Sequence, residues 1–323
     1  MDLMSEIEPD IFQVRIPIPF PLKNIQSYLV READGWTMID TGLNDPPALE
    51  AWEHAFRALQ MTPRDIRRIL LTHTHPDHFG LAGYFQNLSS APVYALNEEI
   101  EIVPREWPPK EIAIPMLSRY FARNGAPPDV MARVAGRSQE VWDMIQPLPV
   151  LSPLHEGDEV QIGGQPYRVI WVPGHADGHL IFHRVSDGLM FIGDHVLMKI
   201  TPNIARWPQL DPNPLKTYLK SLDKVAPLHT SVALPGHRAV IHDLPGRIIE
   251  IKHHHDVRLK ETWAAAGEGC DGYQVARVLF PRLITADDVR LGMVEALSHL
   301  EYLTQAGRLE RLEDETTRYR QRN

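Results

Sequence analysis

Four metal-binding side chains fall within the six residues 73–78, His-Thr-His-Pro-Asp-His. The apolar run 69–71 before them predicts a buried strand, and residues 79–85 after them predict the start of a helix. Ligands commonly bind at such a loop, at the carboxyl end of a strand. His73 and His75 can face one side of an extended chain, and Asp77 and His78 an adjacent side. The stretch therefore predicts two metal ions sharing one loop, with zinc or iron favoured over magnesium.

The same arrangement recurs along the chain. Four further predicted strands end in a histidine or an aspartate, namely Asp40, His175, Asp194 and His237. A lone histidine is usually an ordinary core or surface residue. The histidines at 253–255 are an example, and we expect two of these three on a solvated helix face. Five strand ends of this kind in chain order instead indicate one shared site.

The elements that must position these residues alternate between strands and helices. Two strands at 25–30 and 36–40 flank the turn signal Ala-Asp-Gly and predict a hairpin. Apolar spacing predicts helices at 45–60 and 215–225. The remaining predicted strands cover 11–16, 66–71, 92–96, 158–164, 167–172, 180–185, 189–192 and 231–234. Hairpins followed by strand–helix units predict an α/β sandwich of two or four layers.

Residues 97–151 interrupt this alternation. Prolines cluster there between two stretches with helical spacing, 114–121 and 130–145, which are rich in methionine and aromatic residues. Most of these residues are expected to pack in a core. The insertion as a whole is equally consistent with a lid over the site, lined by some of its aromatic side chains. The lid candidates are Trp107, Tyr120, Phe121 and Trp142.

Composition excludes several classes of protein. The chain has 323 residues, 43% hydrophobic and 23% charged, which fits one large domain or a large and a small one. Its only cysteine, Cys270, excludes an internal disulfide framework and fits a reducing compartment. No apolar run suits a secretory signal or a membrane helix, so we expect a cytoplasmic protein. The net charge of -9 argues against a general nucleic-acid binder.

Together, the motifs between residues 11 and 240 resemble the metallo-β-lactamase-fold hydrolases, which include glyoxalase II, lactonases and ribonuclease Z. The resemblance implies an αββα sandwich with two divalent metal ions, zinc being favoured and iron or manganese being alternatives. The implied first ion binds three histidines, His73, His75 and His175. The implied second ion binds Asp77, His78 and His237, and Asp194 bridges the two ions. Asp77 and Asp194 count as catalytic residues as well as ligands.

Two more residues lie within the motifs but outside this ligand set. Asp40 and His179 are expected to orient ligands or water without binding metal themselves. One departure from the family pattern is Ala176-Asp177, where many relatives have Thr-Pro. It touches no implied ligand, but the added carboxylate would alter the edge of the site.

The chain after residue 244 resembles the winged-helix tail of lactamase-β-like proteins, a group that includes an endoribonuclease. We therefore predict a catalytic domain over 1–244 and a winged-helix-like domain over 245–323, with helices at 245–266, 273–279 and 286–306 and a β wing after them. The tail holds 12 basic against 13 acidic residues, and the wing is acidic. This balance favours packing or homodimer formation over nucleic-acid binding.

These observations predict a metallohydrolase acting on a small ester, thioester or lactone. No Gly-x-Ser-x-Gly motif is present, so a water activated by metal is the expected nucleophile. A metal-dependent endoribonuclease and a non-hydrolytic dinuclear-iron protein remain alternatives. Lys199 and Arg206, which follow Asp194, are the candidates for anchoring a carboxylate or phosphate of a small-molecule substrate.

Overall fold

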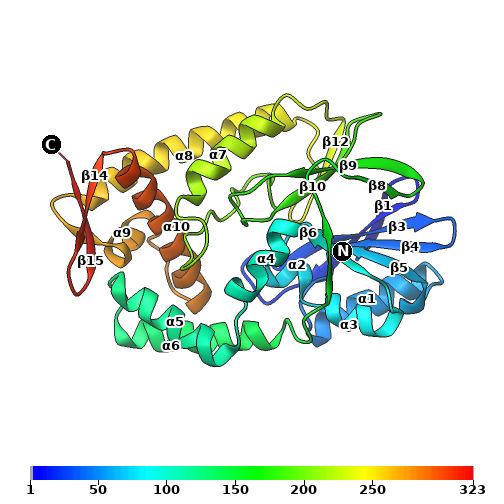
Figure 1. Cartoon of the computed structure of the whole chain (residues 1–323), viewed down its shortest axis with the longest axis horizontal. Helices are drawn as coiled ribbons and strands as arrows, with labels where there is room; N and C mark the ends of the chain where they lie inside the picture. The colour runs from blue at the N-terminus through cyan, green and yellow to red at the C-terminus, as the bar shows by residue number, and fades with distance from the viewer. Residues whose placement is uncertain (1–2, 323) are drawn as a thin grey trace.

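Two β-sheets lie face to face in the right half of the computed structural model as drawn in Figure 1, and the structure describes residues 3–322. The first sheet has seven strands that neighbour one another in chain order. They are β1 Met4–Glu8, β2 Ile11–Pro17, β3 Asn24–Glu32, β4 Gly35–Ile39, β5 Ile66–Leu70, β6 Val93–Leu96 and β7 Leu151–Leu154. The second sheet has the order β12-β11-β10-β9-β8. Its strands are β8 Glu159–Ile162, β9 Gln165–Trp171, β10 Leu180–Arg184, β11 Leu189–Gly193 and β12 Val232–Pro235.

Strand direction in the first sheet determines where loops meet. Strands β1 to β4 are antiparallel neighbours joined by short turns, whereas β4, β5, β6 and β7 are parallel. Parallel strands need crossover connections. Helix α1 (Pro46–Ala58) connects β4 to β5, and α2 (Pro76–Phe79) with α3 (Ala82–Ser89) connects β5 to β6. The carboxyl ends of β4 and β5 therefore meet at one edge, which brings Asp40 and the 73–78 loop together.

Three apolar clusters show that the sandwich has four layers. One cluster packs the side chains of α1 and α3, including Trp52 and Phe85, against the outer face of the first sheet. A second fills the space between the sheets, with Tyr28 and Phe191 in edge contact. A third packs α7 (Pro214–Val225) and the first half of α8 (Leu244–Ala266) on the second sheet. The predicted αββα fold is confirmed.

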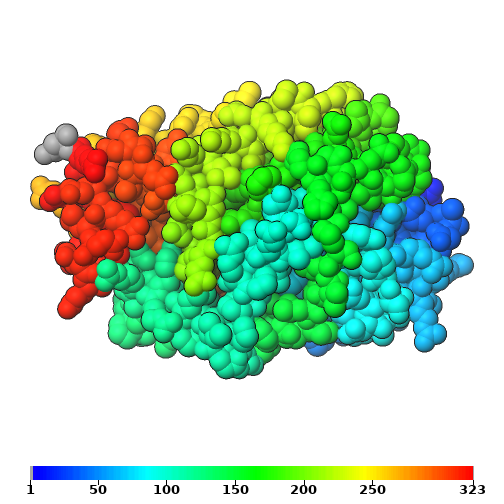
Figure 2. Space-filling view, in the orientation of Figure 1, coloured from blue at the N-terminus to red at the C-terminus, as the bar shows by residue number. Residues whose placement is uncertain are grey.

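The insertion and the C-terminal region share a fourth apolar cluster. The insertion forms three helices, α4 Asn97–Glu106, α5 Lys110–Arg123 and α6 Pro128–Asp143. The C-terminal region has α9 Gly272–Leu279 and α10 Ala286–Gln305, with a small sheet of β13 Cys270–Asp271, β14 Leu309–Glu313 and β15 Thr317–Gln321. Phe121 and Val134 of the insertion pack with Met293 and Leu297 of α10. In Figure 2 the teal insertion meets the orange and red C-terminal region directly.

Several details differ from the sequence-based prediction. Strands β1 and β7 and helix α4 were not predicted, and the helix expected at 79–85 is two short helices, broken at Gly80. Helix α8 begins at Leu244, next to the predicted domain boundary, and packs its first half on the second sheet and its last turn in the C-terminal cluster. Among the three adjacent histidines, His255 is buried and His253 is exposed. No helix within residues 3–322 is both long and apolar enough to cross a membrane.

Candidate metal centre

The loop after β5 places its metal-capable residues by a short extended segment and a helical turn. His75 has extended backbone at the N-cap of α2, and Pro76 occupies the first helical position, where a proline is well tolerated. The next two residues, Asp77 and His78, therefore project from the first turn of α2. The backbone oxygen of His78 accepts hydrogen bonds from the N–H and the hydroxyl of Thr41, which hold the turn against the end of β4.

Three histidines converge in the first part of the centre. His73 Nε2 lies 3.1 Å from His75 Nδ1, and His75 Nδ1 lies 2.9 Å from His175 Nε2. All three rings are buried or nearly so, and their nitrogens lie within 4.8 Å of one another. This is the set expected for the first ion.

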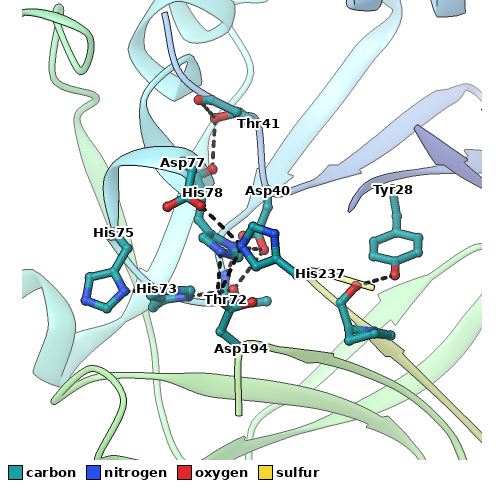
Figure 3. Close-up of polar contacts among 12 residues, drawn as sticks. Tyr28, Asp40, Thr41, Thr72, His73, His75, Asp77, His78, Asp194 and His237 are labelled. Carbon is teal, nitrogen blue, oxygen red and sulfur yellow. Dashed lines mark hydrogen bonds and ion pairs between the residues drawn. The ribbon is translucent and has the colours of Figure 1, made fainter. Parts of the chain in front are cut away.

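The second part of the centre is equally close. The Nε2 atom of His237 lies 3.2 Å from Asp77 Oδ2, and these two residues form a group with His78. Asp194 Oδ2 lies between the two parts, at 3.7 Å from His175 Nε2, 3.5 Å from His78 Nε2 and 3.4 Å from His237 Nε2 (Figure 3). The structure thus brings together all seven residues predicted as ligands, and Asp194 has the position of a bridge.

Hydrogen bonds on the far side of two rings fix which nitrogen faces the centre. His237 Nδ1 donates to the backbone oxygen of Asn24 at 2.8 Å, and His175 Nδ1 donates to that of Asn203 at 2.9 Å. A carbonyl oxygen can only accept, so in the neutral ring Nε2 carries the lone pair and faces the centre. Such partners orient histidine ligands in metal sites.

Asp40 and His179 also contact the ligand residues. Asp40 Oδ2 accepts a hydrogen bond from His78 Nδ1 at 2.8 Å, and the same carboxylate binds the N–H and hydroxyl of Thr72. The Nε2 atom of His179 accepts the backbone N–H of Asp194 at 3.0 Å, and its ring stacks on that of His73. Neither residue belongs to the three candidate ligand groups found in residues 3–322.

The centre fits metal ions for two further reasons. His78 Nε2, His237 Nε2 and Asp194 Oδ1 are buried without a hydrogen-bond partner among the described residues, which is costly unless a cation occupies the space. Gly236 lies beside that space. A Cβ atom there would approach Asp194 Oδ1 to 2.5 Å and His78 Cε1 to 2.6 Å. A residue larger than glycine at this position would therefore fill the space that the ion would occupy.

The electrostatics divide the centre into two halves. Burial and the neighbouring imidazoles hold the pKa of His73 well below its usual value, so this ring is neutral and ready to bind a cation. For His78, burial is outweighed by the carboxylates of Asp194 and Asp40, which hold its pKa well above the usual value. Burial alone would raise the pKa of Asp77, but His237 and His78 lower it to about 2. The pKa of Asp194 is lowered further, against its burial, mainly by His237 and His78.

Two glutamates on α4 belong to the site and were not predicted. Glu99 Oε1 accepts hydrogen bonds from the Thr74 N–H at 2.6 Å and hydroxyl at 2.7 Å, and its Oε2 accepts the N–H of Gly178 at 2.8 Å. One carboxyl thus ties the 73–78 loop to the loop that carries His175. Glu106 Oε1 lies 3.9 Å from His75 Nε2, and burial, then the charge of Glu99, raise its pKa well above the usual value. In the sequence, the one feature that could have indicated a role for Glu99 was its position after the end of a predicted strand.

A cavity of about 760 Å³ opens from the metal centre. Its lining includes Asp77, Asp194 and His237 on one side and the insertion on another. Trp107 and Trp142 line it, as a lid would require, whereas the other two aromatic candidates do not. Phe121 lies in the core, and the Tyr120 hydroxyl donates to the backbone oxygen of Arg206 at 2.6 Å.

The predicted substrate-binding residues lie outside this lining. Lys199 is exposed, with backbone in the left-handed region (φ 66°). The Arg206 guanidinium donates to the backbone oxygen of Trp207, and the Arg206 N–H donates to Val294 of α10 at 2.9 Å. Arg206 therefore connects the insertion and α10. Because neither Lys199 nor Arg206 lines the cavity, the structure gives no support to the prediction that they bind a substrate anion there.

Comparison with known proteins agrees with this geometry. A model of the metallo-beta-lactamase superfamily matches residues 21–237, and a model of the metallo-beta-lactamase-like C-terminal domain matches residues 259–322. The chain belongs to the metallo-beta-lactamase superfamily. The crystal structure of a metallo-beta-lactamase family protein from Thermus thermophilus covers 98% of this chain and all of that one, with a TM-score of 0.90 and 34% identity.

Two further relatives span most of the chain. A beta-lactamase domain protein from Burkholderia ambifaria is 28% identical with a TM-score of 0.82, over 99% of this chain and 95% of that one. The "Probable metallo-hydrolase YqjP" of Bacillus subtilis is 26% identical over 309 residues, 91% of this chain and 92% of that protein. The resemblance to the metallo-β-lactamase-fold family is thereby confirmed.

Proposed function

We propose that this protein is a dinuclear metal-dependent hydrolase of a small ester, thioester or lactone. The observation that carries the proposal is the position of the ligand residues, which form one wall of a cavity with otherwise largely apolar walls. Its volume of about 760 Å³ lies in the range of about 300–1,000 Å³ typical of small-molecule sites. A substrate with a sizeable apolar part would fit there with its reactive bond at the metal centre.

The donor set suits two divalent ions, and zinc is the first choice because imidazole predominates. Such ions would lower the pKa of a water molecule and polarise the substrate carbonyl. Asp77 and Asp194 stay ionised near neutral pH, because neighbouring imidazoles hold the pKa of both carboxyls below the usual range. An ionised carboxylate can accept the proton that the attacking water loses. Hydrolysis then leaves the water oxygen on the acyl carbon and a proton on the departing oxygen or sulfur.

The endoribonuclease alternative has less support. A nuclease binds its polyanion largely through lysine and arginine side chains. On the β14–β15 hairpin, where a wing would contact nucleic acid, Arg311 lies 2.6 Å from Glu313, and Arg320 lies 2.8 Å from Glu310. These basic groups are already paired. We therefore propose that the winged-helix-like region packs against the insertion and completes the cavity.

Metal analysis and a substrate screen test the proposed function. The purified protein should contain two ions per chain by plasma mass spectrometry and should hydrolyse members of an ester, thioester and lactone panel. A chelator should abolish this activity, and added zinc should restore it. His253→Ala, a change at an exposed histidine of α8, controls for general effects of losing an imidazole. Preparations without bound metal, or hydrolysis that survives chelation, would contradict the proposal.

A further inference from the structure

Arg290 differs from the other basic residues that line the cavity. It lies on α10 and lines the same cavity as the metal-ligand candidates Asp77 and His237. Its side chain is only 15% exposed, although it carries a positive charge. By contrast, Arg105 and Arg282 line the cavity as exposed residues, whose charges water can solvate.

No hydrogen bond compensates the buried charge of Arg290. Within residues 3–322 none of its side-chain N–H groups donates to an acceptor, and its Nε is fully buried. The nearest carboxylate oxygen, Asp287 Oδ1, lies 3.8 Å from Nη2, beyond hydrogen-bond distance. The other oxygen of Asp287 accepts a hydrogen bond from Arg137 Nε at 2.9 Å. One carboxylate therefore faces two guanidinium groups, and Arg137 has the closer contact.

Other neighbours do not satisfy Arg290 either. Its guanidinium carbon lies 5.6 Å from the centre of the Trp207 ring, a cation–π contact that supplies no hydrogen-bond acceptor. Asp288, which also lines the cavity, uses its carboxylate to accept the Thr285 N–H at the start of α10. Arg258, another lining residue, shows the contrast. Its Nη1 donates to Glu261 and to the Leu279 backbone oxygen, both at 2.9 Å.

A buried guanidinium with unused donors is costly for the free protein. In agreement, burial and the neighbouring charge of Arg137 lower the pKa of Arg290, although the carboxylates of Asp287 and Asp77 oppose this. A bound ligand that supplies the missing hydrogen-bond acceptors would remove this free-energy cost. An arginine fork matches the two oxygens of a carboxylate or phosphate.

We infer that Arg290 binds an anionic oxygen group, a carboxylate or phosphate, at the far end of a substrate whose middle part is apolar. This inference rests on the proposed function, since it places the reactive ester or thioester at the metal centre and the anionic end at α10. The apolar middle would lie along walls that include Trp107, Trp142 and Leu291. The substrate class is therefore an acyl ester or thioester with a second, charged terminus.

Matched substrate pairs test this inference. One series consists of monothioesters of dicarboxylic acids from succinate to sebacate, and the other carries a methyl ester in place of each free carboxylate. The native protein should prefer the charged member and should show an optimum of chain length, because the anion site has a fixed position. Arg290→Met should raise KM for the best charged substrate by about 10- to 100-fold, the loss expected for charge-assisted hydrogen bonds. KM for the neutral partner should change by less than about threefold, because burial of its apolar part is unaffected.

Two further variants separate binding from folding. Arg290→Lys keeps the positive charge but lacks the planar guanidinium fork. Its KM for the charged substrate should lie between that of the native protein and that of Arg290→Met. Arg277→Met makes the same change at an exposed arginine of α9 outside the cavity lining, and should leave the substrate preference unchanged. Arg290→Met should also stay folded, with a melting temperature close to that of the native protein, because Asp287 keeps its hydrogen bond to Arg137 and only the 3.8 Å ion pair of Arg290 is lost.

A binding measurement keeps this inference separate from the proposed function. Calorimetry on the metal-loaded protein would use a methyl ketone with a terminal carboxylate, which cannot be hydrolysed, and its methyl-ester counterpart. Tighter binding of the carboxylate that is lost in Arg290→Met supports the inference even if no thioester is cleaved. Equal effects of Arg290→Met on both members of a pair, or a large drop in melting temperature with loss of both, would overturn it. Active hydrolysis without charge preference would overturn the inference alone.

Discussion

Replacing Asp40 by asparagine should weaken the second metal site selectively. The Asp40 carboxylate is 2% exposed and lies 2.8 Å from Nδ1 of His78, and it also accepts two hydrogen bonds from Thr72. Asparagine has the same shape and tolerates the left-handed backbone found here (φ 54°), so the fold should persist. The change therefore removes one charge and one acceptor at a fixed position.

The magnitude follows from the hydrogen-bond inventory. If the asparagine oxygen still accepts the Thr72 N–H, its amide group faces His78 Nδ1, and two donors then oppose each other. His78 can relieve this only by moving its proton to Nε2, the atom that faces Asp194. Loss of such a partner typically weakens metal binding by about 10- to 100-fold, which corresponds to about 1.4–2.8 kcal/mol. The metal affinity of the three-histidine site should fall less, because Thr72 contacts His73 whereas Asp40 does not.

Competition with a chromophoric zinc chelator, together with metal analysis after dialysis, measures the two affinities separately. Asp45→Asn is the matched control, because Asp45 caps α1 through the Ala48 N–H and asparagine caps equally well. Circular dichroism should show native-like spectra for both variants. An Asp40→Asn protein that holds two ions with native affinity would refute the reasoning, as would equal weakening of both sites.

Other perturbations give distinct outcomes. His75→Ala should remove the first ion and most hydrolysis, and full metal content in that variant would contradict the ligand assignment. Acidification should release the second ion first. Nearby carboxylates raise the pKa of His78 and His237 against their burial, whereas the pKa of His73 in the first site is lowered. Protons therefore compete with the second ion at a higher pH than with the first. Metal content measured across a pH series would show one transition instead of two if this is wrong. Lys199→Ala should raise KM for an anionic substrate less than Arg290→Met does, and the reverse order would restore the sequence-based assignment. Gel-shift titrations should show weak RNA binding at physiological salt, and tight, salt-sensitive binding with metal-dependent cleavage would favour the nuclease alternative.

The metal-ligand candidates could be found from the sequence because each carries a local signal. A strand ending in a metal-capable residue is visible in the chain itself, and the parallel order of β4, β5 and β6 places such ends at one sheet edge. His175, Asp194 and His237 carry the same signal on the second sheet. The alternation of elements predicted an α/β sandwich of two or four layers, and the family resemblance implied its αββα form. Both depend on short-range patterns.

The cavity could not be read in this way, because its walls come from distant parts of the chain. Lys199 and Arg206 were chosen for their closeness in sequence to Asp194, but neither is among the residues that line the cavity. Arg290 lies almost a hundred residues further on, and nothing in its helical pattern distinguishes it from other arginines of the tail. The burial of Arg290 and its lack of hydrogen-bond partners arise only in the folded protein, where α10 packs beside Trp207.

The C-terminal region also reaches the metal centre itself. Glu295 of α10 accepts a hydrogen bond from the Asn203 side chain at 2.8 Å, and the backbone oxygen of Asn203 accepts one from His175 Nδ1 at 2.9 Å. Glu295 is 8% exposed, and this burial raises its pKa to about 7, against its hydrogen bond to Asn203. The helix that carries Arg290 therefore helps to orient His175, a candidate metal ligand, through Asn203, and it also lines the cavity. Residues of α10 that face only the cavity can change substrate preference while these hydrogen bonds and the metal ligands stay in place.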